Sequence, residues 1–389
     1  MQSQRLNKLP PYLFAELDRK KKALLAKGAD LIDLSIGDPD IETPPHIVKA
    51  LRESVGDKRF HRYPPYNGIP EFREAAVQYM KRRFNASLDV NSEILTLIGS
   101  KEGIYHTPFA LANPGDAILV PSPGYPVYST AAILAGCAVH EMPLKWENNF
   151  LPDFSLIPKD IIKRAKILFL NYPNNPTSAV ATKDFFAGAV EFARQNNILL
   201  CHDAAYVEIA YDGLKAPSIF EVEGAKEVAV EFHSLSKTFN MTGWRIGFVA
   251  GKAEAVSAIG KIKTNADSSA TAFVQRAAAA ALASDMKCVE ENCRIYKERR
   301  EILAKGLKKI GLKVYDSSAT FYVWASASPL PSPSRGEGEG EGDITSRLLE
   351  KSHIAATPGE GFGTYGKGYI RFSLSAPTER IKEAVERIS

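Results

Sequence analysis

The segment that decides the fold reads Ser234-Leu-Ser-Lys-Thr-Phe-Asn-Met-Thr-Gly-Trp-Arg-Ile-Gly-Phe248, with Lys237 at its centre. An apolar run (Val228, Val230, Phe232) precedes it, and a Gly-Trp-Arg turn follows. The run is typical of a buried strand. A lysine flanked by hydroxyl residues at the end of such a strand is unusual for an exposed surface. We therefore predict that the amine of Lys237 points into a pocket.

The neighbours of Lys237 suit one kind of chemistry. A lysine that forms a Schiff base with an aldehyde cofactor needs partial desolvation, and nearby hydroxyls and an arginine can hold a phosphate on that cofactor. Ser234, Ser236 and Arg245 are the candidate phosphate ligands. A bare Ser-x-x-Lys is more often a strand end followed by a polar loop. The longer Ser-x-Ser-Lys string followed by Gly-Trp-Arg-x-Gly favours the cofactor site.

The composition bounds the class of protein. The 389 residues are 45% hydrophobic and 24% charged, which is enough for two domains with a large core. A net charge of +4 gives no reason to expect nucleic acid or an anionic membrane as a partner. No segment has the apolar length of a signal peptide or a membrane span. The four cysteines form no Cys-x-x-Cys pair and no metal spacing with histidines, so we expect reduced thiols in a cytosolic protein and no metal.

Five apolar runs alternate with helical segments. Runs of this kind indicate a mostly parallel sheet that is buried on both faces, and hence an α/β fold. They cover Ile94–Ile98, Ala117–Val120, Ile167–Leu170, Ile198–Leu200 and Val228–Phe232.

Polar side chains follow several of these runs. Gly99-Ser-Lys-Glu-Gly lies before a helix, where free N–H groups favour an anion, so Ser100 and Lys101 are phosphate candidates. Ser100 could instead only cap the helix, and Lys101 could face the substrate. Tyr125, on the constrained loop Pro-Gly-Tyr-Pro-Val-Tyr, could stack on a flat ring or pack in the core.

Two further strand ends carry an amide and an acid. In Asn171-Tyr-Pro-Asn-Asn-Pro-Thr-Ser we predict that Asn175 donates to a phenolate oxygen of the cofactor and that the Asn175–Pro176 bond is cis. Asp203 ends another buried run and needs a cationic partner, such as a protonated pyridine nitrogen. Tyr206 can bond the phenolate oxygen beside Asn175, while we interpret His202 as a packing residue.

The ends of the chain add further candidates. Gly37, in Gly-Asp-Pro, permits a tight turn or the close approach of a ligand. Tyr66 lies on a proline-stiffened loop and could form a packing corner or reach a partner chain. A long charged helix from about Met286 to Ile310 indicates a change of domain. Beyond it, Arg371 lies on a strand and is a candidate for binding a carboxylate. Residues 326–343 are of low complexity and predict a mobile surface loop.

Taken together, these segments resemble the fold-type I, pyridoxal-phosphate-dependent aminotransferases of class I/II. Within that class the chain is similar to the LL-diaminopimelate aminotransferase family. The segments that carry the likeness are Pro-Pro-Tyr-Leu-Phe from Pro10, Ile-Gly-Asp-Pro-Asp from Ile36, Ile-Gly-Ser-Lys-Glu-Gly-Ile from Ile98, His-Asp-Ala-Ala-Tyr from His202, and Glu-Phe-His-Ser-Leu-Ser-Lys-Thr-Phe-Asn-Met-Thr-Gly-Trp-Arg from Glu231. Ser178 departs from the glycine that is usual in the family's Asn-Pro-Thr-Gly.

The resemblance implies a role for each candidate. Lys237 would bind the cofactor covalently, with Asp203 on the ring nitrogen, Tyr125 stacked on the ring, and Asn175 and Tyr206 on its phenolate oxygen. The phosphate would be held by Ser100, Lys101, Ser234, Ser236, Arg245 and, from the neighbouring subunit of a homodimer, Tyr66. The substrate would contact Tyr12, Gly37, Lys101, Asn175, Asn265 and Arg371.

The resemblance also implies an architecture and a reaction. Residues 1–40 would form an N-terminal arm and helix, residues 41–285 a large cofactor-binding domain with a helix-covered sheet, and residues 286–389 a smaller α/β domain. The reaction would be transamination between LL-diaminopimelate and 2-oxoglutarate in lysine biosynthesis. An aminotransferase for aspartate, alanine or an aromatic amino acid, or a β-lyase, would share the same cofactor residues. A regulator with this fold would need a DNA-binding module, for which the likeness leaves no room.

Overall fold

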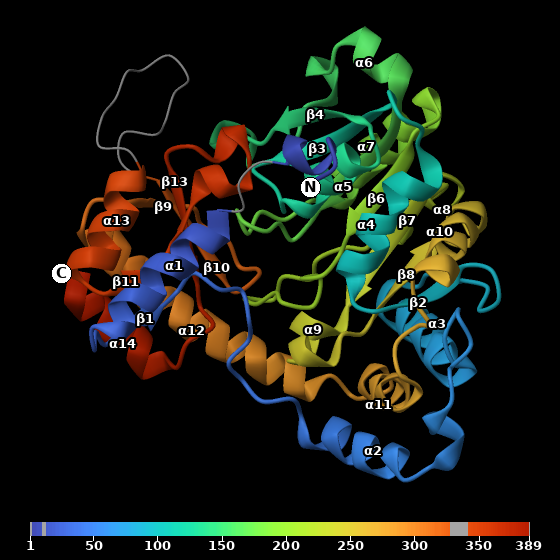
Figure 1. Ribbon diagram of the computed structural model, residues 1–389, viewed down its shortest axis with the longest axis horizontal. Coiled ribbons are helices and arrows are strands. Elements are labelled where there is room, and N and C mark those ends of the chain that lie inside the picture. The colour runs from blue at the N-terminus through green and yellow to red at the C-terminus, as the bar shows by residue number, and fades with distance from the viewer. Residues whose placement is uncertain (1, 10–12, 327–340, 389) are drawn as a thin grey trace.

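A seven-stranded, mostly parallel sheet lies at the centre of the larger part of the computed structural model, which describes residues 2–9, 13–326 and 341–388 (Figure 1). The strand order is β2-β8-β7-β6-β5-β3-β4. Within the group β3 to β7, every pair of neighbouring strands is parallel. Strand β8 is antiparallel to both of its neighbours, β2 and β7. The strands are β2 (Ile94–Leu97), β3 (Ala117–Ser122), β4 (Ala138–Pro143), β5 (Ala165–Asn171), β6 (Leu199–Asp203), β7 (Ala229–Ser234) and β8 (Gly247–Gly251). The predicted α/β fold and its five strands are confirmed, while β4 and β8 were not predicted.

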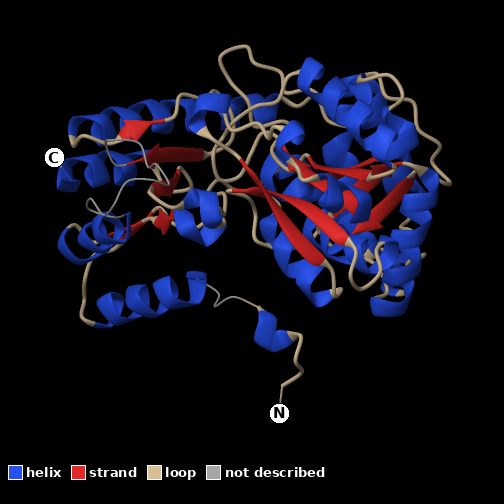
Figure 2. Cartoon of the chain, turned by 90° about the horizontal axis from the view of Figure 1, so that it is seen from above, coloured by secondary structure: helices blue, strands red, loops and turns tan. Residues whose placement is uncertain are grey.

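Helices cover both faces of this sheet (Figure 2). Successive side chains of each strand point to opposite sides, so the apolar strands present an apolar surface on each face. In β5, Phe169 packs on one side and Leu170 on the other. The first face packs on α4 (Ser100–Leu111), α5 (Val127–Leu134) and α10 (Ala253–Ala266). The second packs on α3 (Pro70–Phe84), α7 (Lys183–Asn196) and α11 (Ala272–Leu282). The other helices of this part of the chain are α2 (Pro45–Val55), α6 (Lys159–Arg164), α8 (Ala225–Val228) and α9 (Leu235–Thr238).

A second, antiparallel sheet in the order β12-β13-β10-β9 lies in the C-terminal part of the chain. A parallel pair of β1 with β11 joins the N-terminal segment to that part. The division into domains at residues 40 and 285 stays a prediction. The elements are α1 (Leu13–Ala26), β1 (Ile32–Asp33), α12 (Lys287–Lys309), β9 (Lys313–Val314), β10 (Tyr322–Ser326), α13 (Glu341–Lys351), β11 (Ile354–Ala355), β12 (Thr357–Pro358), β13 (Tyr369–Ser373) and α14 (Thr378–Ile388).

The predicted low-complexity loop is corrected at both ends. Ser326 belongs to β10, where it pairs with Tyr369, and residues 341–343 begin α13. Ladder hydrogen bonds and the propagation of a helix therefore order residues whose local composition predicts a loop. Residues 327–340 lie outside the described part of the chain.

The turn after β5 has an unusual backbone. The Asn175–Pro176 bond is cis, as predicted. Ser178 has φ +63°, so this position does take the left-handed conformation that the family's usual glycine adopts without strain. The Ser178 hydroxyl lies 2.6 Å from Thr320 Oγ1 and donates to the carbonyl of Tyr322 at 3.0 Å. These contacts offset part of the cost of a serine at this position.

Candidate active site

A cavity of about 550 Å³ lies where the carboxyl ends of β6 and β7 meet the second sheet and the segment Ser35–Asp38. Its wall contains most of the predicted site residues: Gly37, Ser100, Lys101, Tyr125, Asn175, Asp203, Tyr206, Ser234, Ser236, Lys237, Arg245 and Arg371. These residues come from segments spread over more than three hundred positions of the chain. The structure therefore brings the predicted candidates into one site.

Lys237 lies on the one-turn helix α9, directly after β7, and its Nζ donates to the carbonyl oxygen of Gly37 at 2.7 Å. Burial lowers the pKa of Lys237 to about 8, against the opposing influence of Asp38 and with help from the positive charges of Arg245 and Arg371. A sizeable fraction of the amine is then neutral near pH 8, which is what a nucleophilic lysine requires.

Gly37 has no room for a side chain. A Cβ at this position would lie 1.9 Å from the hydroxyl oxygen of Tyr322. The glycine therefore lets the backbone approach Tyr322 and Lys237 closely.

Asp203 is only 5% exposed and ends β6 at the cavity. Its Oδ2 accepts a hydrogen bond of 2.7 Å from the Tyr128 hydroxyl, and the amide of Ala205 donates to Oδ1 at 3.3 Å. Burial raises the pKa of Asp203, and the bond from Tyr128 opposes that rise. A buried carboxylate with so few donors is suited to a cationic partner in the cavity.

Arg371, on β13, is 3% exposed and lies between Asn175 and the N-terminal segment. Nη1 donates to Asn175 Oδ1 at 2.9 Å, and Nη2 donates to the carbonyl of Ser35 at 2.6 Å. Its neighbours Ile370 and Phe372 pack in the hydrophobic core. Because successive side chains of a strand point to opposite faces, Arg371 points the other way, into the cavity. A guanidinium in this setting can take a carboxylate through two parallel hydrogen bonds.

The candidate phosphate site combines a helix start with hydroxyls. Ser100 is the first residue of α4, and Gly99 caps it with φ +78°. A Cβ on Gly99 would lie 2.4 Å from Arg245 Nη2, so only a glycine lets the arginine reach the start of this helix. Ser236 Oγ is buried and has no hydrogen-bond partner within the described residues.

These features fit pyridoxal phosphate. An unpartnered hydroxyl beside an arginine and a helix N-terminus suits a phosphate dianion. The same cavity supplies an amine of lowered pKa in Lys237 and a buried carboxylate in Asp203. Lys101, whose Nζ lies 5.8 Å from the centre of the Tyr125 ring, is also in this wall.

Three predicted residues are not placed in the cavity. Tyr66 is 52% exposed and is not in the wall. Asn265 is exposed on α10, where its Nδ2 donates to the carbonyl of Lys261 at 2.8 Å. Tyr12 lies outside the described residues.

The sequence reasoning missed several residues of the site. Tyr128, which donates to Asp203, is the last residue of the same Pro-Gly-Tyr-Pro-Val-Tyr motif that contains Tyr125. Asn171, in the cavity wall, begins the motif that contains Asn175. Both motifs predict a site residue, Tyr125 in the first and Asn175 in the second, and neither motif distinguishes its second contributor by local pattern. Tyr322 carried no local signal beyond its apolar strand. Asp38 lies in the wall next to Gly37.

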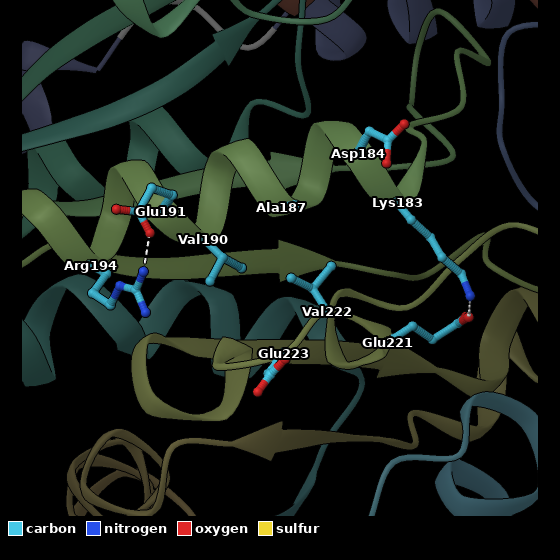
Figure 3. Close-up of a pocket in the computed structure, with 9 residues that line it drawn as sticks. All are labelled: Lys183, Asp184, Ala187, Val190, Glu191, Arg194, Glu221, Val222 and Glu223. Atoms are coloured by element: carbon cyan, nitrogen blue, oxygen red, sulfur yellow. Dashed lines mark hydrogen bonds and ion pairs between the residues drawn. The ribbon is translucent and has the colours of Figure 1, made fainter.

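A second hollow, of about 370 Å³, lies between α7 and the segment Glu221–Glu223 (Figure 3). Four of its charged side chains form ion pairs, Lys183 with Glu221 and Arg194 with Glu191. It contains none of the predicted site residues. The described residues hold no cluster of three or more histidine, cysteine or acidic side chains that could bind a metal. Nor does any helix among them have the length and apolarity needed to cross a membrane.

Comparisons with known proteins agree with this geometry. The profile of the family described as aminotransferase class I and II matches residues 29–388. The LL-diaminopimelate aminotransferase of Syntrophobacter fumaroxidans is 51% identical over 388 residues, covering 100% of this chain and 98% of that protein. The enzyme of the same name from Aquifex aeolicus is 50% identical, covering 99% and 98%. The substrate-bound structure of BacF from Bacillus subtilis has a TM-score of 0.94 at 39% identity, covering 100% of this chain and 97% of that one.

Proposed function

The chain belongs to the class I and II aminotransferase family, and from this premise we propose that it transfers the amino group of LL-diaminopimelate to 2-oxoglutarate. The convergence of Lys237, Asp203 and Arg371 on one cavity is the observation that carries the chemistry. The substrate rests on the names of relatives that are about half identical over their whole length. In the biosynthetic direction the same reaction forms LL-diaminopimelate, in lysine biosynthesis.

Enzymes of this family depend on pyridoxal 5′-phosphate, which supplies an electrophilic carbonyl and a ring that accepts electrons. In this chain Ser100, Ser234, Ser236 and Arg245 would hold its phosphate, with Lys101 near the ring of Tyr125. Asp203 would hold the proton on the ring nitrogen, and its burial beside Tyr128 keeps water away from that pair.

Lys237 would carry out two tasks. Its neutral amine would bind the cofactor covalently, and after the amino donor has displaced it, the same Nζ would remove the proton from the substrate Cα. The carbonyl of Gly37, 2.7 Å from Nζ, fixes the position from which the lysine acts. Arg371 would bind the α-carboxylate and, through Asn175, align it with the ring oxygen.

The decisive experiment mixes the cofactor-loaded enzyme with LL-diaminopimelate in the absence of an oxo-acid acceptor. Loss of the visible absorption of the lysine-bound cofactor is expected with LL-diaminopimelate and much less with L-aspartate, L-alanine and L-phenylalanine. Conversion with one of these three alone would replace the substrate and keep the chemistry. Repeated release of pyruvate from an added amino acid that carries a leaving group on Cβ would identify a β-lyase instead.

Lys237→Ala tests the chemistry separately from the substrate. The variant is expected to bind the cofactor without a covalent link and to lose transamination. Mass spectrometry after borohydride reduction measures the link, and a coupled assay measures turnover. Full turnover of the variant would contradict the role of Lys237.

We also propose a homodimer in which Tyr66 acts on the cofactor phosphate of the neighbouring subunit, while the contact of Asn265 with substrate stays a prediction. In support, Tyr66 and Tyr63 are exposed on one loop, and Leu6 in the N-terminal segment is half exposed. Sedimentation should show a dimer, and Tyr66→Phe should weaken cofactor binding without changing the sedimentation.

A cytosolic location stays part of the proposal, since all four cysteines are free thiols.

A further inference from the structure

Tyr322 occupies a point where three parts of the site meet. This β10 residue is 2% exposed and contributes to the cavity wall. Its hydroxyl oxygen lies 2.9 Å from that of Tyr206. The guanidinium carbon of Arg371 lies 4.3 Å from the centre of its ring, within the range of a cation–π contact. One side chain thus touches a predicted cofactor ligand and the predicted carboxylate ligand.

The backbone and the hydroxyl of Tyr322 are both held in place. The Tyr322 amide donates to Thr320 Oγ1 at 3.0 Å, and its carbonyl accepts from Ser178 Oγ at 3.0 Å. On the far side, the hydroxyl packs against Gly37, at which any side chain would collide with it. The phenol of Tyr322 therefore has little freedom to leave Tyr206.

Either of the two phenols can donate the hydrogen bond that joins them. Among the described residues, the Tyr322 hydroxyl has no hydrogen-bond partner other than Tyr206. Burial raises the pKa of both phenols, so both keep their protons at neutral pH. When Tyr322 donates to the Tyr206 oxygen, the proton of Tyr206 is free to point into the cavity.

We propose that Tyr322 is a positioning residue, which donates to Tyr206 so that the Tyr206 proton is directed at the ring oxygen of the cofactor, and whose ring supports Arg371. One rigid side chain makes both contacts, so it fixes the position of the ring-oxygen site relative to the carboxylate site. The proposal rests on the proposed function for the partners of Tyr206 and Arg371, and not on the identity of the amino donor.

Tyr322→Phe tests the hydroxyl, since it removes one oxygen and keeps the ring against Arg371. The matched control is Tyr296→Phe. Tyr296 is fully buried, its ring centre lies 5.2 Å from that of Phe321, and its hydroxyl has no partner among the described residues. Thermal melting of both variants without cofactor checks that each one folds.

The first readout is the pH titration of the visible absorption of the loaded enzyme, with no substrate present. In Tyr322→Phe the midpoint should move to higher pH by roughly half to one unit, the effect of about one hydrogen bond. A weaker bond to the ring oxygen leaves more negative charge beside the nitrogen of Lys237, which then holds its proton more tightly. The affinity of the cofactor-free protein for the cofactor should fall roughly two- to tenfold. Tyr296→Phe should change neither value.

Tyr322→Leu tests the ring. It should reproduce the titration shift and, in addition, raise the KM for the amino donor roughly two- to tenfold, because Arg371 loses the ring that supports it. Tyr322→Phe should instead lower kcat with little change in KM. An unmoved midpoint in a folded Tyr322→Phe would overturn the proposal, even if its melting temperature or cofactor affinity had fallen. Because the titration needs no amino donor, it decides the role of Tyr322 even if LL-diaminopimelate is not the substrate.

Discussion

Asp203 and Glu231 are two buried carboxylates on neighbouring strands, and their surroundings differ completely. Asp203 pairs with Phe232 in the β6–β7 register, and His202 pairs with Glu231, so the two acids lie on opposite faces of the sheet. Glu231 is fully buried and accepts hydrogen bonds from four donors: His202, His233, the Ser218 hydroxyl and the Ile219 amide. Asp203 accepts from Tyr128 and the Ala205 amide alone among the described residues, and it faces the cavity.

The pKa values of the two acids follow these surroundings. Burial by itself would raise the pKa of Glu231, but hydrogen bonds from His202 and His233 outweigh it and hold that pKa well below its usual range. At Asp203 burial prevails, and the pKa is raised. A buried acid whose partners are complete within the chain is structural, whereas one left short of donors beside a cavity is available for a ligand.

The largest expected effect is on stability, at Glu231. Glu231→Gln removes the charge between two histidines and should lower the free energy of unfolding by about 3–5 kcal/mol. The folded-state pKa of Glu231 is lowered, so its stabilisation is present above the unfolded pKa of about 4.3 and is lost as the pH falls below that value. Chemical denaturation of the cofactor-free protein at pH 7 and pH 3 measures both effects. A kcat reduced more than about tenfold in the folded variant would break the comparison.

The complementary change is Asp203→Ala. We expect kcat to fall by roughly 10²–10³, the usual effect of removing one preorganised electrostatic partner. Stability without cofactor should change little, since the lost carboxylate is poorly compensated. Steady-state kinetics and thermal melting provide the two measurements. An unchanged rate would place Asp203 with Glu231 among the structural acids.

A smaller effect is expected for Tyr128→Phe. The hydrogen bond from Tyr128 lowers the pKa of Asp203, so its loss should raise that pKa further. Because the role proposed for Asp203 requires its ionised form, the acid limb of the pH–rate profile should move to higher pH by about one unit. Tyr172→Phe, which removes a hydroxyl that bonds the Phe150 carbonyl away from the cavity wall, is the matched control. Equal profiles for the two variants would contradict the role of Tyr128.

The smallest effect is expected at Ser178, which lies beside neither acid. Ser178→Gly relieves the left-handed backbone and loses the hydroxyl contacts to Thr320 and Tyr322, so the stability should change by less than about 1 kcal/mol. Ser178→Ala keeps the strain and loses the same contacts, and it should therefore be the less stable of the two. Melting temperatures of the pair test this order, and a more stable alanine variant would reverse it.

Much of the site could be predicted because its residues lie in short motifs at the ends of strands. Lys237, Asp203 and Asn175 each follow an apolar run, and the carboxyl ends of parallel strands meet at one edge of a sheet. Tyr322 could not be predicted in this way, since its bond to Tyr206 joins residues 116 positions apart. Asn265 was predicted through the family likeness alone, and Tyr66 through its stiff loop and that likeness. A single chain brings neither of them to its own cavity.

By itself the sequence determined the α/β architecture, the strands that carry the site and the chemical groups available there, because apolar periodicity and turn residues act over a few positions. Only the tertiary structure decided which acid is structural and which faces the cavity. Asp203 and Glu231 look alike in the sequence, each within a buried apolar run. Their difference comes from what covers each face of the sheet: two histidines and a serine over Glu231, and open space beside Asp203. Those partners are distant in the sequence, so packing alone assigns them.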